Sequence, residues 1–133
     1  MIQALGHVAL YVHDLQASEH FYCGILGLAK VFEAKNEAGK VNMVYLNIAP
    51  GQYLELFLMP DPTQQWHENP VGPTHLCLTV ADIEAAEALL TAKQWPHDPV
   101  RQGKYGNSQC WTADPDGTRI ELMQIFADFL QAT

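Results

Sequence analysis

The chain has 133 residues, of which 48% are hydrophobic and 17% charged, so it can bury the core of one globular domain but is too short for several. Its 15 Asp and Glu exceed its 7 Lys and Arg, and the resulting formal net charge of −8 has the wrong sign for binding nucleic acid or an anionic membrane. No apolar run approaches the roughly 18 residues that span a bilayer, and no basic residue precedes an apolar stretch at the start, so we expect a soluble, cytoplasmic protein without nucleic-acid or membrane partners.

The chain contains an internal repeat. Gly6–Leu15 aligns without a gap with Thr74–Ile83, and Gly51–Leu56 aligns with Gly117–Leu122. The stretch between the two copies contains four prolines, which exclude a regular helix there. We therefore predict one domain built from two similar modules. Its parts are module one at about 1–59, a linker at 60–73, module two at about 74–125 and a C-terminal tail at 126–133.

In the first module, apolar periodicity and turn signals predict a strand, a helix and three further strands. Asp14 precedes the helix as an N-cap, and Gly27 ends it. The predicted elements are strand 6–13, helix 15–26 and strands 31–35, 42–48 and 52–59.

The second module repeats this order after a first strand that begins near Thr74. Asp82 takes the N-cap position, and the sequence Asp-Pro-Asp-Gly at 114–117 predicts the turn before the last strand. The predicted elements are helix 83–93, strands 98–103, 108–113 and 118–125, and a short closing helix over 126–131.

The repeat places a His on the first strand and a Glu on the last strand of both modules. Because side chains alternate across a strand, His7 lies on the face opposite to Val8 and Leu10, which pack toward the helix. By the same alternation, the other His and both Glu residues lie on the face opposite to the apolar residues beside them. The four residues are His7, Glu55, His75 and Glu121.

A single His or Glu at such a place would be typical of the wet face of an antiparallel sheet. Their joint occurrence favours a metal site, because two-fold pairing of the modules would bring all four together. Two imidazoles and two carboxylates suit Zn²⁺, Ni²⁺, Co²⁺ or Mn²⁺. We therefore predict a site for one divalent metal ion, whose identity the ligands leave open.

The remaining cysteines, histidines and tryptophans are expected to be structural. Cys23, Cys77 and Cys110 fit neither a disulfide framework nor a zinc knuckle, so we expect reduced, mostly buried thiols. We expect packing or dimer contacts at Trp66, His67 and Trp95. We expect surface positions for His13, His20 and His97.

The paired openings at 7–15 and 75–83 and the ending Asp-Pro-Asp-Gly-Thr-Arg-Ile-Glu-Leu at 114–122 resemble the vicinal oxygen chelate superfamily, which includes glyoxalase I and bleomycin-resistance proteins. The resemblance covers nearly the whole chain. It implies an α+β fold of two βαβββ modules, whose curved mixed sheets form a cup around a divalent metal within the chain or across a homodimer. The positions at which glyoxalase I-type members hold the metal fall on His7, Glu55, His75 and Glu121.

The complete His/Glu/His/Glu set favours glyoxalase I-like chemistry over other members of the superfamily. Extradiol dioxygenases lack the second ligand, methylmalonyl-CoA epimerases typically carry Gln at the position of Glu55, and antibiotic-binding members usually lack the set. The resemblance implies a lyase or isomerase that acts on a small α-hydroxy-carbonyl or thiohemiacetal substrate through a metal-bound enediolate, with Glu55 and Glu121 moving the proton. The alternatives are an epimerase of another small carbonyl or acyl compound and a non-catalytic, antibiotic-type binding protein.

The substrate is left open by two departures from the bacterial glyoxalase I pattern, in which an Arg and an Asn help to hold glutathione. This chain has Tyr11 and Met59 at those positions. We also expect a homodimer, because the sheets leave edges and a cup to cover. The candidates for substrate binding are Tyr11, Phe57, Asn107, Gln109 and Trp111.

Overall fold

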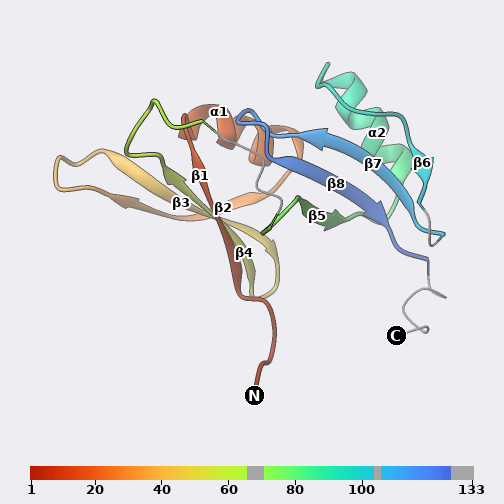
Figure 1. Ribbon diagram of the computed structural model, residues 1–133, viewed down its shortest axis with the longest axis horizontal. Coiled ribbons are helices and arrows are strands. Elements are labelled where there is room, and N and C mark those ends of the chain that lie inside the picture. The colour runs from red at the N-terminus through yellow and green to blue at the C-terminus, as the bar shows by residue number, and fades with distance from the viewer. Residues whose placement is uncertain (66–70, 104–105, 127–133) are drawn as a thin grey trace. The chain divides into compact units, whose positions relative to one another are not determined.

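The computed structural model describes residues 1–65, 71–103 and 106–126. The chain forms two compact units, Met1–Gln65 and Trp66–Thr133, and the boundary between them lies within the linker expected over 60–73. Each unit contains a four-stranded sheet accompanied by helix (Figure 1). None of the helices in the described part of the chain has the length and apolar character needed to cross a bilayer.

The first unit has a mixed sheet in the strand order β1-β4-β3-β2. Strand β1 runs parallel to β4, while β3 is antiparallel to both β4 and β2. The elements are β1 (His7–Val12), α1 (Leu15–Glu19), the π-helix η1 (His20–Ile25), β2 (Ala29–Lys35), β3 (Val41–Ala49) and β4 (Gln52–Leu58).

The second unit repeats this topology with the order β5-β8-β7-β6 and a parallel β5/β8 pair. The α+β class and the two βαβββ modules are thereby confirmed. The elements are β5 (Leu76–Thr79), α2 (Ile83–Ala92), β6 (Arg101–Gln102), β7 (Ser108–Ala113) and β8 (Arg119–Gln124).

Both helices begin at the aspartates that the sequence indicates. Asp14 and Asp82 are extended residues, with φ −140° and −142°, and each side chain accepts a hydrogen bond from a backbone N–H three residues later. The bonds come from Ala17 at 3.1 Å and Ala85 at 3.0 Å. Each cap satisfies a backbone donor that the first turn leaves free.

The predicted helix 15–26 differs from the observed one in its second half. It is α-helical only to Glu19 and continues as a π-helix, whose wider turn is closed by the bond from Leu26 N to Phe21 O at 2.9 Å. The adjacent Phe21 and Tyr22 are both fully buried. Apolar spacing alone does not distinguish a π turn from an α turn, so the sequence predicted the element and its end at Gly27 but not its type.

Most strand limits agree with the predicted ones within two residues, including β2, which begins at Ala29 instead of residue 31. The exception is the strand expected over 98–103, which is reduced to Arg101–Gln102. The closing helix predicted over 126–131 lies outside the described residues from residue 127 onward.

The core of each module lies between its helix and one face of its sheet. The strands that carry the predicted Glu ligands bury their alternate residues completely or nearly so: Leu54 and Leu56 on β4, and Ile120 and Leu122 on β8. Each glutamate thus points to the opposite face from two anchored neighbours, which fixes its direction.

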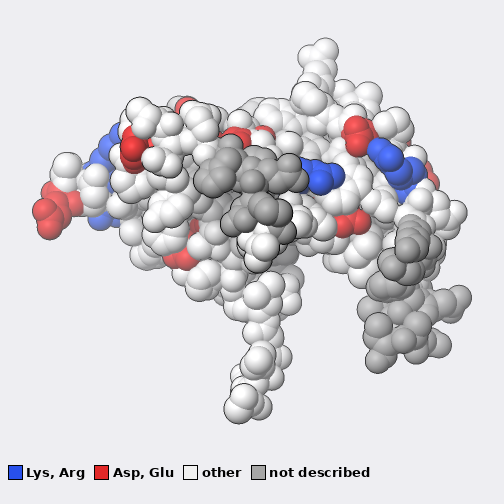
Figure 2. Space-filling model, in the orientation of Figure 1, with Lys and Arg blue, Asp and Glu red and all other residues white. Residues whose placement is uncertain are grey.

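Lys and Arg side chains form small, separate groups on the face shown in Figure 2. That distribution agrees with the excess of acidic residues and gives no continuous basic surface on this face.

Candidate metal-binding site

In module one, the predicted ligands His7 and Glu55 lie side by side. His7 Nε2 is 3.3 Å from Glu55 Oε2. The parallel pairing of β1 and β4 brings them together, because Glu55 is in register with Ala9, two residues after His7 on the same face. Glu55 is only 8% exposed, so its carboxylate needs a polar partner.

Module two repeats this arrangement with His75 and Glu121. His75 Nε2 is 3.1 Å from Glu121 Oε2. Glu121 is in register with Cys77, as Glu55 is with Ala9. His75 precedes β5 instead of lying within it, but its side chain reaches the same face.

An aromatic residue on the third strand of each module stands opposite the glutamate and contacts the histidine. Tyr45 is paired with Glu55, and Trp111 with Glu121. The ring centroids of Tyr45 and His7 are 6.0 Å apart, with an angle of 66° between the ring planes. Those of Trp111 and His75 are 4.8 Å apart, with an angle of 67°. These edge-on contacts restrict how the imidazoles turn.

Neighbouring side chains donate hydrogen bonds to both carboxylates. The Tyr45 phenol bonds to Glu55, and this bond raises the pKa of Tyr45. The Cys77 thiol bonds to Glu121, and although the residue as a whole is exposed, partial burial of its sulfur together with the Glu121 charge raises the pKa of Cys77 to about 11. Cys77 therefore stays protonated as a donor near neutral pH. The expectation of mostly buried thiols is wrong for Cys77, which is exposed. It lies on the same face of its sheet as His75 and Glu121, and the face of each sheet that carries the His–Glu pair is called the site face below.

The chemistry and spacing of each pair fit a divalent metal ion. Two ligand atoms bound to one ion at about 2.0–2.2 Å, with an angle near 90–110°, are about 3.0–3.5 Å apart, and both observed N···O distances fall in that range. Thr74 Oγ1 is 2.8 Å from His75 Nδ1. If Nδ1 donates its proton to that hydroxyl, the Nε2 lone pair is free to bind a metal.

The structure thus brings the four predicted ligands together as two pairs, each within its own module. Within 1–65, 71–103 and 106–126, no three His, Cys, Asp or Glu side chains form a group that could hold a metal ion. The site with all four ligands stays a prediction.

The predicted substrate-binding residues occupy different environments. Tyr11 and Phe57 are in register on β1 and β4, with ring centroids 6.0 Å apart, and Tyr11 is 60% exposed. Gln109 and Trp111 lie on the same face of β7, and the indole N–H of Trp111 donates to the Gln109 side-chain oxygen. Asn107, in contrast, is only 6% exposed, before β7.

Sequence reasoning missed Tyr45, Thr74 and the role of Cys77. The signal for Tyr45 was present, because it precedes Glu55 by the same interval as Trp111 precedes Glu121. Extending the repeat to the third strand would have found it. Nothing in the repeat marks Cys77, whose counterpart is Ala9.

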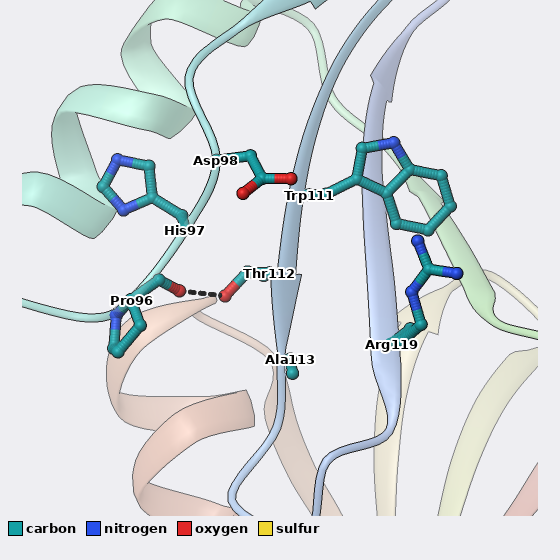
Figure 3. Close-up of a pocket in the computed structure, with 7 residues that line it drawn as sticks. All are labelled: Pro96, His97, Asp98, Trp111, Thr112, Ala113 and Arg119. Atoms are coloured by element: carbon teal, nitrogen blue, oxygen red, sulfur yellow. Dashed lines mark hydrogen bonds between the residues drawn. The ribbon is translucent and has the colours of Figure 1, made fainter. Parts of the chain in front are cut away.

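A pocket of about 350 Å³ lies beside Trp111 at the edge of β7 (Figure 3). His97, expected at the surface, is instead half-buried there, with Nδ1 2.8 Å from Trp95 O and Nε2 3.2 Å from Thr91 Oγ1. Trp95 donates its indole N–H to Ala113 O at 2.9 Å, so it packs within module two. The lining residues are Pro96, His97, Asp98, Trp111, Thr112, Ala113 and Arg119.

Known proteins with this sequence pattern and fold include both enzymes and binding proteins. A model of the Glyoxalase/Bleomycin resistance protein/Dioxygenase superfamily matches residues 4–122. YaeR from Escherichia coli (strain K12) is 31% identical over 129 residues, covering 92% of this chain and 97% of YaeR.

Two solved structures illustrate the range of activities on this fold. A lactoylglutathione lyase from Agrobacterium tumefaciens matches with a TM-score of 0.71 and 24% identity, covering 92% of this chain and 94% of that one. TnmS3, an antibiotic binding protein from Streptomyces sp. CB03234, matches with a TM-score of 0.72 and 20% identity, covering 94% and 98%. At these identities the likeness shows a shared fold, and the fold alone does not decide the activity.

Proposed function

Because the chain belongs to the glyoxalase/bleomycin resistance protein/dioxygenase superfamily, we propose that it is a divalent-metal-dependent lyase or isomerase of the glyoxalase I type. Its substrate is a small α-hydroxy-carbonyl compound or thiohemiacetal. The metal ligands are His7, Glu55, His75 and Glu121, brought together within one chain or between the two chains of a homodimer. We place this homodimer in the cytoplasm, where its free cysteines stay reduced.

The observation that carries the proposal is the repetition of one His–Glu geometry in both modules. In each, a histidine Nε2 lies within 3.3 Å of a glutamate Oε2 on the face opposite the core. We would not expect a sheet face that only contacts solvent to repeat this pair together with a side chain that donates to the carboxylate and an aromatic ring that contacts the histidine.

When bound, the metal ion supplies a Lewis acid that stabilises negative charge on two neighbouring substrate oxygens. The protein residues then carry the proton transfer. A glutamate carboxylate removes the proton from the hydroxyl-bearing carbon beside the carbonyl and returns it to the carbonyl carbon, while the hydroxyl proton passes to the former carbonyl oxygen, so no atoms are gained or lost. The buried leucines beside Glu55 hold the strand in place, while the carboxylate itself needs only side-chain rotation.

A second candidate is a protein that binds a small aromatic molecule without converting it. The observation that favours it is the ring cluster on the site face of module one. The ring centroid of Tyr45 lies 5.9 Å from that of Tyr53 and 6.3 Å from that of Phe32, and the Tyr11 ring contacts that of Phe57. Such a face would stack against a flat apolar ligand.

Proton transfer in D₂O separates the two candidates. The chain loaded with Zn²⁺ or Ni²⁺ is incubated with methylglyoxal hemithioacetals of glutathione and of smaller thiols, and with α-hydroxy ketones and epimerisable acids. Proton NMR follows both product and deuterium uptake. We expect turnover of at least one class, with Glu55→Gln and Glu121→Gln each lowering kcat by about 10²-fold or more.

Glu84→Gln is the matched control, because Glu84 is exposed on the first turn of α2 and should leave kcat unchanged. Turnover of the acids alone would identify an epimerase. A metal-loaded chain that exchanges no substrate proton and nevertheless binds aromatic ligands would overturn the enzyme proposal in favour of the second candidate.

A further inference from the structure

Arg119 presents a cation on the site face of module two. Its guanidinium carbon lies 4.5 Å from the ring centroid of Trp111. Trp111 in turn contacts the His75 ring at 4.8 Å, and Arg119 precedes Glu121 by two residues on the same face of β8. Figure 3 shows the Arg119 side chain directed toward the indole at one side of the pocket.

The other polar groups in the pocket are already engaged. Asp98 forms an ion pair with Arg101 at 3.1 Å, and both ring nitrogens of His97 have partners. Arg119, in contrast, is exposed and forms no ion pair with any described residue. The pocket therefore contains one positive charge whose N–H groups have no carboxylate to bind.

The contact with Trp111 leaves donors of Arg119 available. A guanidinium has five N–H groups, and a single indole face engages only those directed at it. The remaining N–H groups can bind a carboxylate by two parallel hydrogen bonds. Because Trp111 already restricts the side chain, binding a ligand costs less side-chain entropy than at a free arginine.

We propose that Arg119 and Trp111 form a subsite for a carboxylate group of the substrate, so that the substrate is a small anionic carbonyl compound. This inference rests on the function proposed above for its link to catalysis. The pocket of about 350 Å³ has room for such a group and a short chain of carbons. Through Trp111 the subsite adjoins His75, which is where the reacting end of the same molecule would lie.

The charge is specific to module two. Tyr53 is the counterpart of Arg119 in the repeat, and its ring packs on Tyr45 as Arg119 packs on Trp111. One module thus offers an aromatic surface and the other a cation at equivalent positions.

The test is NMR of the ¹⁵N-labelled full-length chain, with the Trp111 indole signal assigned through Trp111→Phe. The probes are butyrate and butyramide, which match in shape and differ in charge, at pH 8 and constant ionic strength. We expect butyrate to shift the Trp111 signal with a Kd about fivefold or more below that of butyramide. Arg119→Gln should abolish the preference, and Arg119→Lys should retain part of it.

Lys93→Gln is the matched control, since Lys93 is an exposed cation of the same module, at the C-cap of α2, and does not line the pocket. It should keep the preference within about twofold of the unaltered chain. Equal Kd values for butyrate and butyramide, or the same loss in Lys93→Gln as in Arg119→Gln, would overturn the subsite.

Metal content, measured on every NMR sample, separates this proposal from the proposed function. A chain that binds metal but does not prefer butyrate would refute the subsite alone. A chain that prefers butyrate through Arg119 but takes up no metal would refute the metal-dependent activity and leave the anion subsite standing.

Discussion

At the scale of single residues, the site depends on contacts that orient the predicted ligands. The two His–Glu pairs themselves were predictable, because a His and a Glu recur at equivalent positions of a repeat. The repeat marks Tyr45 by its interval from Glu55, but its hydrogen bond to that carboxylate, like that of Cys77 to Glu121, depends on strand register, which the sequence does not state. The structure supplies that register and with it the role of the third strand.

The phenol of Tyr45 should strengthen metal binding by holding Glu55. We expect Tyr45→Phe to weaken Zn²⁺ affinity by about tenfold, because the substitution removes the hydrogen bond while retaining the ring contacts with His7 and Tyr53. Competition against a fluorescent chelator measures the affinity. Tyr53→Phe is the control, and an equal loss in both variants would show that the hydroxyl of Tyr45 has no particular role.

At the scale of elements, local chemistry predicts where helices begin and end better than what kind of helix forms. Asp14, Asp82 and Gly27 mark limits that the structure confirms, whereas nothing in the apolar spacing marks the π turn after Glu19. The short β6 is a second case. Residues 98–103 carry strand signals, but only Arg101 and Gln102 form a ladder with β7, whereas Asp98 meets that strand through the bond from its N–H to Trp111 O and the bond that its carbonyl accepts from the Cys110 thiol.

The N-cap of α2 should contribute measurably to stability. Asp82→Ala removes the acceptor for the Ala85 N–H and should lower the free energy of unfolding by about 1 kcal/mol. Urea denaturation followed by circular dichroism measures the change. Asp82→Asn keeps an acceptor at the same place and should retain most of the stability; if it destabilises as much as Ala, the cap is not the cause.

The central strand β4 should be the most sensitive element of module one. Leu56 is fully buried beside Glu55, and Leu56→Ala should cost about 2–5 kcal/mol of unfolding free energy because it leaves a cavity. The exposed Gln52 on the same strand provides the comparison, since Gln52→Ala should change stability by less than about 0.5 kcal/mol. Similar effects of the two substitutions would contradict the described packing of β4.

At the scale of the whole molecule, the sequence predicted more of the organisation than of the chemistry. The two modules, the order of elements along each and the face that carries each His–Glu pair all follow from one repeat and from alternation along strands, whereas the order of the strands in each sheet comes from the structure. The pocket beside Arg119 could not be predicted, because it forms where the segment at 96–98 pairs with β7 through isolated contacts. Such contacts depend on the path of a loop, which has no periodic signal.

The central claim is that the two His–Glu pairs hold one ion jointly, and metal counting tests it most directly. Inductively coupled plasma mass spectrometry of the purified chain after loading with Zn²⁺ or Ni²⁺ should find about one ion per chain. His7→Ala and His75→Ala, which alter different modules, should each remove most of that metal, while the exposed His20→Ala should retain it. Full metal content in either ligand variant, or no metal in the unaltered chain under any loading, would contradict the account.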